Sequence, residues 1–107
     1  MIKFTVYENK AGEIVGFDCS GHARYAEEGH DIICAAVSVL IINTINAIEK
    51  FTEDAFKADQ DEKKGIWLRV ENPGEKSTLL LNSLVLGMEG IIKDNDGEYI
   101  KIIFKEV

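Results

Sequence analysis

The sequence is short of positive charge. Lysine and arginine together number 12 against 19 aspartates and glutamates, so the formal net charge at pH 7 is −7. Because phosphate binding requires a basic face, this balance argues against a nucleic-acid backbone as the direct partner. An acidic surface instead favours encounter with a basic protein, which biases the charge of a partner without identifying it.

Targeting signals and membrane spans are not expected either. The N-terminus, Met1 to Phe4, lacks the basic-then-apolar profile of a signal peptide, and no apolar run is expected to be long enough to span a membrane. We therefore expect a cytoplasmic location and no membrane partner. The only two cysteines, Cys19 and Cys34, are then expected to be free thiols rather than a disulfide.

No internal repeat, low-complexity tract or linker divides the chain. Its 107 residues are typical of one domain, so we predict a single domain over residues 1–107. The 46% hydrophobic content can supply a core for it, although one core stabilises a domain of this size only marginally.

Two strands that form a hairpin are predicted at the N-terminus. Along the first strand apolar and polar residues alternate, and its apolar face consists of Ile2, Phe4 and Val6. A turn at residues 9–12 follows, and the second strand has on one face Val15, Phe17 and Cys19. A long helical pattern then runs from Ile32 to about Phe51. Asp31 suits its N-cap, which would put Cys34 at the third helical position.

The C-terminal half predicts two more strands, a second helix and a final strand. A charged stretch at residues 59–65 separates a short strand around Phe56 from a better one at 66–70. The second helix opens with Pro73 at its first position and runs to about Lys93. After a turn at 94–97, one face of the last strand consists of Ile100, Ile102 and Phe104. The order ββαββαβ predicts an α+β fold of two layers, an antiparallel or mixed sheet carrying two helices.

Both predicted helices are apolar on more than one face. The first carries Ile33, Val37, Leu40, Ile41 and Ile48, and the second is rich in leucine between residues 79 and 92. A helix that is apolar all round is expected to be buried all round, which a two-layer monomer of this size has trouble providing. A homodimer that buries a helix face is the simplest remedy, and a helix lying deep against a curved sheet is the alternative.

A histidine and a cysteine flank the loop before the first helix. His22 follows the second strand, and Cys34 lies just inside the helix in Asp31-Ile32-Ile33-Cys34-Ala35-Ala36-Val37-Ser38. A cysteine protease needs such a pair, a thiol that becomes a thiolate and an imidazole that takes and returns a proton. The helix N-terminus and an adjacent imidazole would both lower the pKa of the thiol.

Three further residues surround this pair. Asp31, Cys34 and Ser38 share one stripe of the helix, so Asp31 either orients the imidazole of His22, caps the helix, or does both. Ser38 either donates a hydrogen bond to the sulfur or bonds back to its own backbone. Gly21 ends the strand alternation, which suits a bend that redirects the next side chain.

The loop that joins His22 to the helix has two possible functions. The charged loop from Arg24 to His30, closed by Gly29, is either a mobile flap over a substrate groove or an ordinary surface connection. Ala35 and Ala36 are small, which would let a substrate backbone come close to the thiol.

This segment resembles the signature of the ribosomal-processing cysteine proteases of bacteria. The resemblance is carried by Gly21-His22-Ala23, Gly29 and the run from Asp31 to Ser38, and in length and element order it covers essentially the whole chain. It places the nucleophile at Cys34 and the general base and acid at His22. Gly21, Asp31 and Ser38 fall on supporting positions.

The resemblance also implies an activity. Similar enzymes are cysteine endopeptidases that remove a short N-terminal extension from large-subunit ribosomal protein twenty-seven, a basic substrate, cutting after an aromatic and before a small residue. They serve ribosome maturation, act as homodimers and require no metal or organic cofactor.

Two other functions remain open from the residues. Cys19, His22, His30 and Cys34 are ligand types that zinc prefers, although their spacing matches no standard zinc knuckle. The other alternative is a ribosome-associated binding module without enzymatic activity, in which Cys34 and His22 are incidental. In that case we expect Cys34 to be a buried and sluggish thiol.

Overall fold

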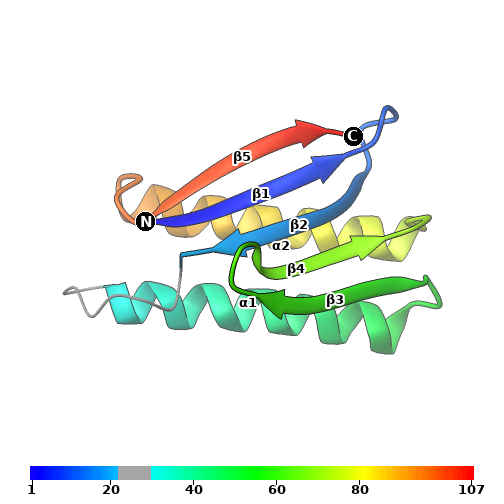
Figure 1. The fold of residues 1–107 in the computed structure, drawn as a ribbon, viewed down its shortest axis with the longest axis horizontal. Helices are drawn as coiled ribbons and strands as arrows, with labels where there is room; N and C mark the ends of the chain where they lie inside the picture. Colours follow the sequence, from blue (N-terminus) through cyan, green and yellow to red (C-terminus); the bar gives the residue numbers. More distant parts are fainter. Residues whose placement is uncertain (22–29) are drawn as a thin grey trace.

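One five-stranded sheet covered on one face by two helices forms the protein (Figure 1). The computed structural model describes residues 1–21 and 30–107. Its elements are β1 (Ile2–Glu8), β2 (Ile14–Ser20), α1 (His30–Phe51), β3 (Phe56–Asp61), β4 (Gly65–Val70), α2 (Glu75–Asp94) and β5 (Ile100–Glu106). This order confirms the predicted ββαββαβ pattern and the two-layer α+β class.

The sheet is mixed and has the strand order β3-β4-β2-β1-β5. β1 pairs with β2, β2 with β4 and β3 with β4 in antiparallel fashion, whereas β1 and β5 are parallel. The predicted hairpin of the first two strands is therefore confirmed, and the C-terminal strand completes the sheet beside the N-terminal one.

A β-bulge corrects the predicted face of β2. Tyr7 pairs with Gly16 but Glu8 pairs with Ile14, so Val15 is an extra residue on β2. The bulge turns Ile14, which is 5% exposed, onto the face that Phe17 and Cys19 share. The prediction that Val15 belongs to this face is wrong because strict alternation does not hold across a bulge.

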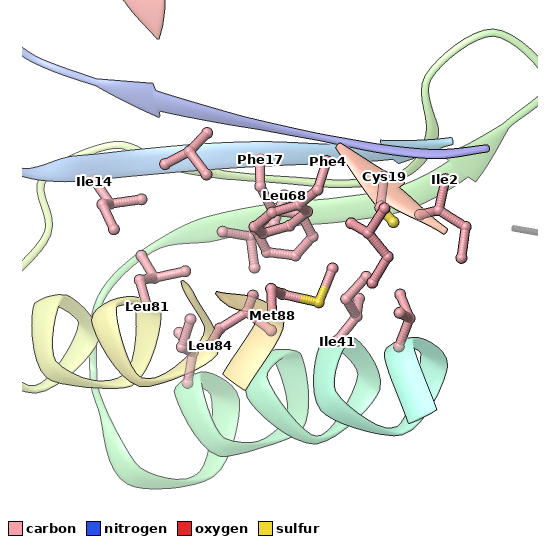
Figure 2. Close-up of a cluster of buried hydrophobic side chains, with 14 of the residues drawn as sticks. Ile2, Phe4, Ile14, Phe17, Cys19, Ile41, Leu68, Leu81, Leu84 and Met88 are labelled. Atoms are coloured by element: carbon pink, nitrogen blue, oxygen red, sulfur yellow. The ribbon is translucent and has the colours of Figure 1, made fainter. Parts of the chain in front are cut away.

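The core lies between the sheet and the two helices, as Figure 2 shows. Phe4 and Phe17 form its centre, with ring centroids 5.5 Å apart. Leu68 joins them from β4, and Leu81, Leu84 and Met88 from α2; α1 contributes Val37, Ile41 and Ile48. Each of these side chains is at most 2% exposed, so the apolar faces predicted from the periodicity meet in one cluster.

Element boundaries differ from the predicted ones by a few residues. Helix α1 begins at His30, so Asp31 is its second residue rather than its N-cap, and Cys34 is the fifth helical residue rather than the third. The N-cap of α2 is Gly74, and Pro73 therefore precedes the helix instead of opening it. β3 extends to Asp61, so part of the charged stretch is an exposed edge strand.

Helix α1 also corrects the expectation about membrane spans. The segment Ile32–Phe51 has a mean hydropathy of 2.0 and is long and apolar enough to cross a membrane, although core helices pass the same test. One side of α1 packs into the core, and the opposite side exposes Val39 and Ile42. The helix is thus apolar on two faces, as predicted, and the sheet covers only one.

Candidate active site

Cys34 lies in the second turn of α1, half-buried against the core cluster. The free backbone N–H groups of a helix belong to its first turn, and the effect of the helix dipole fades beyond that turn. Because α1 begins at His30, Cys34 gains less from the helix N-terminus than its predicted third position implied.

Gly21 ends β2 with a conformation that suits glycine. Its φ is +82°, in the left-handed region, and a Cβ at this position would lie 2.5 Å from the carbonyl oxygen of Met1. The predicted bend after the strand is confirmed. Its predicted purpose, which is to redirect the side chain of residue 22, stays a prediction.

Residues 22–29 lie outside the part of the chain that the structure describes. This includes His22 and the loop from Arg24 to Gly29, so neither the histidine–cysteine pair nor the flap is tested. His30, the predicted end of that loop, already belongs to α1. The end of β2 and the start of α1 lie at the same end of the molecule (Figure 1).

The two cysteines have different surroundings. Cys19 is 0% exposed and points into the core in Figure 2, and this burial raises the pKa of its thiol to about 12. Electrostatic repulsion from Cys34 adds to the rise in the pKa. Neither cysteine forms a disulfide, as predicted, and Cys19 stays protonated at neutral pH.

Two of the supporting residues lie on α1. Ser38 follows Cys34 by one turn and is half-buried; within the described residues its side chain forms no hydrogen bond. Asp31 belongs to the first turn through its backbone, and its side chain lies outside what the structure describes. The predicted roles of both residues stay predictions.

The zinc alternative needs Cys19 as one of its four ligands, but Cys19 lies in the core. Cys19 is 0% exposed and packs within the apolar core cluster. Among residues 1–21 and 30–107 no group of three or more histidines, cysteines or acids could hold a metal ion. The sequence-based interpretation of Cys19 as a core residue is thus the one that fits its environment.

A shallow groove of about 620 Å³ runs between the outward sides of α1 and α2. It begins at Ala35 and Ala36, beside Cys34, and the facing side is formed by Gly87 and Gly90. The helices approach closely here, since a Cβ at Gly87 would lie 3.1 Å from Leu40. The role of Gly87 and Gly90 was not predicted from the sequence, although two glycines three residues apart in an apolar helix indicate a face where another helix can approach closely.

Comparisons with known proteins agree with this fold. A family model described as cysteine protease Prp matches residues 1–101. The chain is 26% identical over 107 residues to the ribosomal processing cysteine protease Prp of Staphylococcus aureus strain Mu50, covering 98% of this chain and 100% of the relative. It is 28% identical over 101 residues to the Bacillus subtilis protein of the same name, covering 88% and 89%.

Solved structures show the same architecture. The S. aureus protease in complex with a substrate peptide has a TM-score of 0.89 at 25% identity, covering 98% of this chain and 100% of the other. The structure of SMU.848 from Streptococcus mutans has a TM-score of 0.81 at 29% identity, covering 100% and 99%. Fold and sequence together define a cysteine protease. The chain belongs to the cysteine protease Prp family, as the resemblance in its signature implied.

Proposed function

We propose that the protein is a ribosomal processing endopeptidase whose nucleophile is Cys34. The observation that carries this proposal is the contrast between its only two cysteines. Cys19 is buried in the core as a thiol with a pKa of about 12, which leaves Cys34 as the sulfur that a substrate can reach. The relatives are named for this processing, and one S. aureus structure holds a covalently linked product peptide.

The chemistry needs one acid–base partner, for which we propose His22. The thiolate of Cys34 attacks the scissile carbonyl carbon, and the imidazolium of His22 protonates the leaving amine. Water, deprotonated by His22, then attacks the thioester and releases the acyl fragment, which restores the thiol. Asp31 orients the imidazole and Gly21 aims the residue that follows it. The Ser38 hydroxyl, one turn from Cys34 and not hydrogen-bonded within the described residues, would have to rotate toward the sulfur to donate to it. No step requires a metal or an organic cofactor.

The proposed substrate is the N-terminal extension of large-subunit ribosomal protein twenty-seven, in the cytoplasm. The net charge of −7 supports a basic substrate, because opposite charges speed encounter. The ribosomal processing named for the relatives supports the same assignment.

We also propose that the enzyme is a homodimer built on the outward sides of α1 and α2. Large apolar side chains are exposed there, including Ile32 at 75%, Val39 at 67% and Leu86 at 70%. The groove lined by small residues between them would let helices of a second copy pack closely. In sedimentation velocity, Val39→Glu with Leu86→Glu should yield a monomer, whereas Lys57→Glu with Lys105→Glu should leave the dimer intact.

Cleavage of a peptide that spans the junction of the ribosomal protein tests the catalytic proposal. Mass spectrometry should show one cut by the native enzyme, none by Cys34→Ala, and a rate lowered about 10²–10⁴-fold by His22→Ala. Cys19→Ser is the matched control and should still cut, with or without a chelator. A cut that survives Cys34→Ala, or that disappears with the chelator, would overturn the proposal.

Thiol labelling separates the peptidase from a binding module without needing the substrate. Iodoacetamide should modify Cys34 in the folded protein at neutral pH, more slowly after His22→Ala, and should modify Cys19 only after unfolding. A Cys34 that is as unreactive as Cys19 would favour the binding module.

A further inference from the structure

The sheet face that points away from the helices is positively charged, although the whole chain is negative. Alternation along the strands directs five cations to this face, namely Lys3, Lys57, Arg69, Lys101 and Lys105, against the three acids Asp18, Asp59 and Asp61. The net charge of −7 is an average over the chain, and the charge of this face has the opposite sign.

One row of this face crosses all five strands and contains no acid. The strand registers align Lys105, Tyr7, Gly16, Arg69 and Lys57 from β5 to β3. At about 4.8 Å per strand, its two terminal lysines are about 19 Å apart at the Cα atoms. The row is therefore a basic track across the width of the sheet, with Asp18 and Asp59 in the neighbouring row.

Planar groups lie in the middle of the row and beside it, since Trp67 belongs to the neighbouring row between Asp18 and Asp59. The guanidinium carbon of Arg69 lies 4.4 Å from the centroid of the Tyr7 ring and 5.7 Å from that of Trp67, and Lys64 Nζ lies 5.0 Å from the Trp67 centroid. Gly16 leaves room for this side chain, since a Cβ there would be 2.9 Å from Arg69 Cδ.

Hydrogen bonds fix Arg69 in this position. Its Nη1 donates to the carbonyl oxygens of Phe17, at 2.9 Å, and Leu68, at 2.8 Å, and its Nη2 donates to Asp18 Oδ1 at 2.7 Å. Arg69 and Trp67 both remain partly exposed. A pre-ordered set of π surfaces is therefore in place between the lysines at either end of the row.

A second row adds unpaired charge. Lys3 and Lys101 are direct neighbours on the parallel strands β1 and β5, and like charges in such a pair repel each other. Within the described residues neither lysine has a carboxylate at ion-pair distance, since the ion pair there joins Arg69 and Asp18. A bound anion would relieve this repulsion.

We propose that this open sheet face docks a single-stranded segment of RNA. Lysines at both ends of the track match backbone phosphates, and the exposed parts of Trp67 and Arg69 offer stacking surfaces for bases. An acidic protein segment would use the lysines and leave the exposed parts of Trp67 and Arg69 uncovered, which is why the surface favours RNA. The choice of RNA over DNA rests on the proposed function, because a ribosomal protein is encountered together with RNA.

Titration of the full chain with a fluorescently labelled single-stranded RNA 12-mer at low salt tests the proposal. Trp67 is the only tryptophan, so binding at this face should both raise the anisotropy of the label and quench the protein fluorescence. Lys57→Glu with Lys105→Glu should weaken binding at least about tenfold and lower the slope of log K against log salt by about 1.4, which corresponds to two phosphate contacts on a single strand.

A matched pair on α2 controls for net charge. Lys76→Glu with Lys93→Glu changes the charge of the chain by the same amount on exposed positions of the other layer, and should weaken binding much less. All of these variants should still cleave the free junction peptide, so failure of RNA binding and failure of the peptidase remain distinguishable. No binding by the native chain, or equal losses in both pairs, would overturn the proposal. Equal affinity for an RNA duplex or for a polyglutamate peptide would also overturn it, the latter in favour of an acidic protein partner.

Discussion

The two faces of the sheet are built on different physical principles. The face toward the helices is closed by apolar packing around Phe4 and Phe17. The opposite face is organised by directional contacts around Arg69, which joins an ion pair, two carbonyl acceptors and two aromatic rings. On the face toward the helices, burial should therefore dominate stability. On the open face, the positions and charges of the side chains should matter more for recognition than for folding.

The largest contrast should come from truncating one side chain on each face. Phe17→Ala leaves a cavity in the packed core, and the free energy of unfolding should fall by about 3–5 kcal/mol. Lys57→Ala on the open face should change it by less than about 0.5 kcal/mol. Urea denaturation measures both; comparable losses would mean that the open face is covered by another molecule in solution.

The contrast should not hold at every position, because adding a single methyl group on the open face should also destabilise the protein. In Gly16→Ala the new Cβ would meet the carbonyl oxygen of Leu68 at 2.4 Å and Arg69 Cδ at 2.9 Å. The backbone must shift, and we expect a loss of about 1–3 kcal/mol of unfolding free energy. Ser20→Ala, on the same strand and face, is the control and should be close to neutral in the same denaturation experiment.

Removal of the charge at the centre of the open face should cost less. Arg69→Met loses the ion pair with Asp18 and both carbonyl contacts, but the pair is partly exposed, at 37% and 17%, so water already weakens it. We expect a loss of about 1 kcal/mol, and a coupling to Asp18→Asn of about 0.2–1 kcal/mol in a double-mutant cycle that shrinks with added salt. A coupling that is insensitive to salt would contradict this description.

The smallest effect should be a pH dependence on the same face. The hydrogen bond that Tyr7 donates to Asp18, followed by partial burial, raises the pKa of the phenol above 10.0. The folded state therefore favours the protonated phenol, so this contribution is complete below about pH 10 and is lost as the pH rises through the raised pKa.

Two variants isolate this contribution. Tyr7→Phe should flatten the alkaline decline of unfolding free energy, and Asp18→Asn should return the tyrosine titration toward its usual pKa, as followed by the ultraviolet absorbance of tyrosinate. An unchanged titration in Asp18→Asn would assign the shift to burial alone.

Apolar periodicity was sufficient to predict the order of the elements, because each predicted face has a place in one core. It failed where local geometry changes without a change in composition. The bulge at Val15 and the start of α1 at His30 are such places, since neither an extra strand residue nor a helix boundary alters the apolar pattern enough to be read.

The sequence likewise predicted part of the candidate site and could not predict the rest. Spacing singled out Cys34, and the strand pattern placed Cys19 in the core, where its burial is confirmed. Sequence could not supply the environment of each thiol, because the pKa of Cys19 depends on what packs around it in three dimensions. The basic sheet face was hidden for a related reason, since net charge does not record which strands become neighbours.

The parallel pairing of β1 with β5 also has a consequence in time. Ile2 aligns with Ile100, so β1, which is synthesised before β5, waits for it before its edge is closed. Contacts of such large sequence separation form slowly, because a long loop must close before they are made. A nascent chain that lacks β5 leaves the backbone N–H and C=O groups on this edge of β1 unpaired. A chain that is released from the ribosome before β5 pairs with β1 would therefore expose this edge to aggregation.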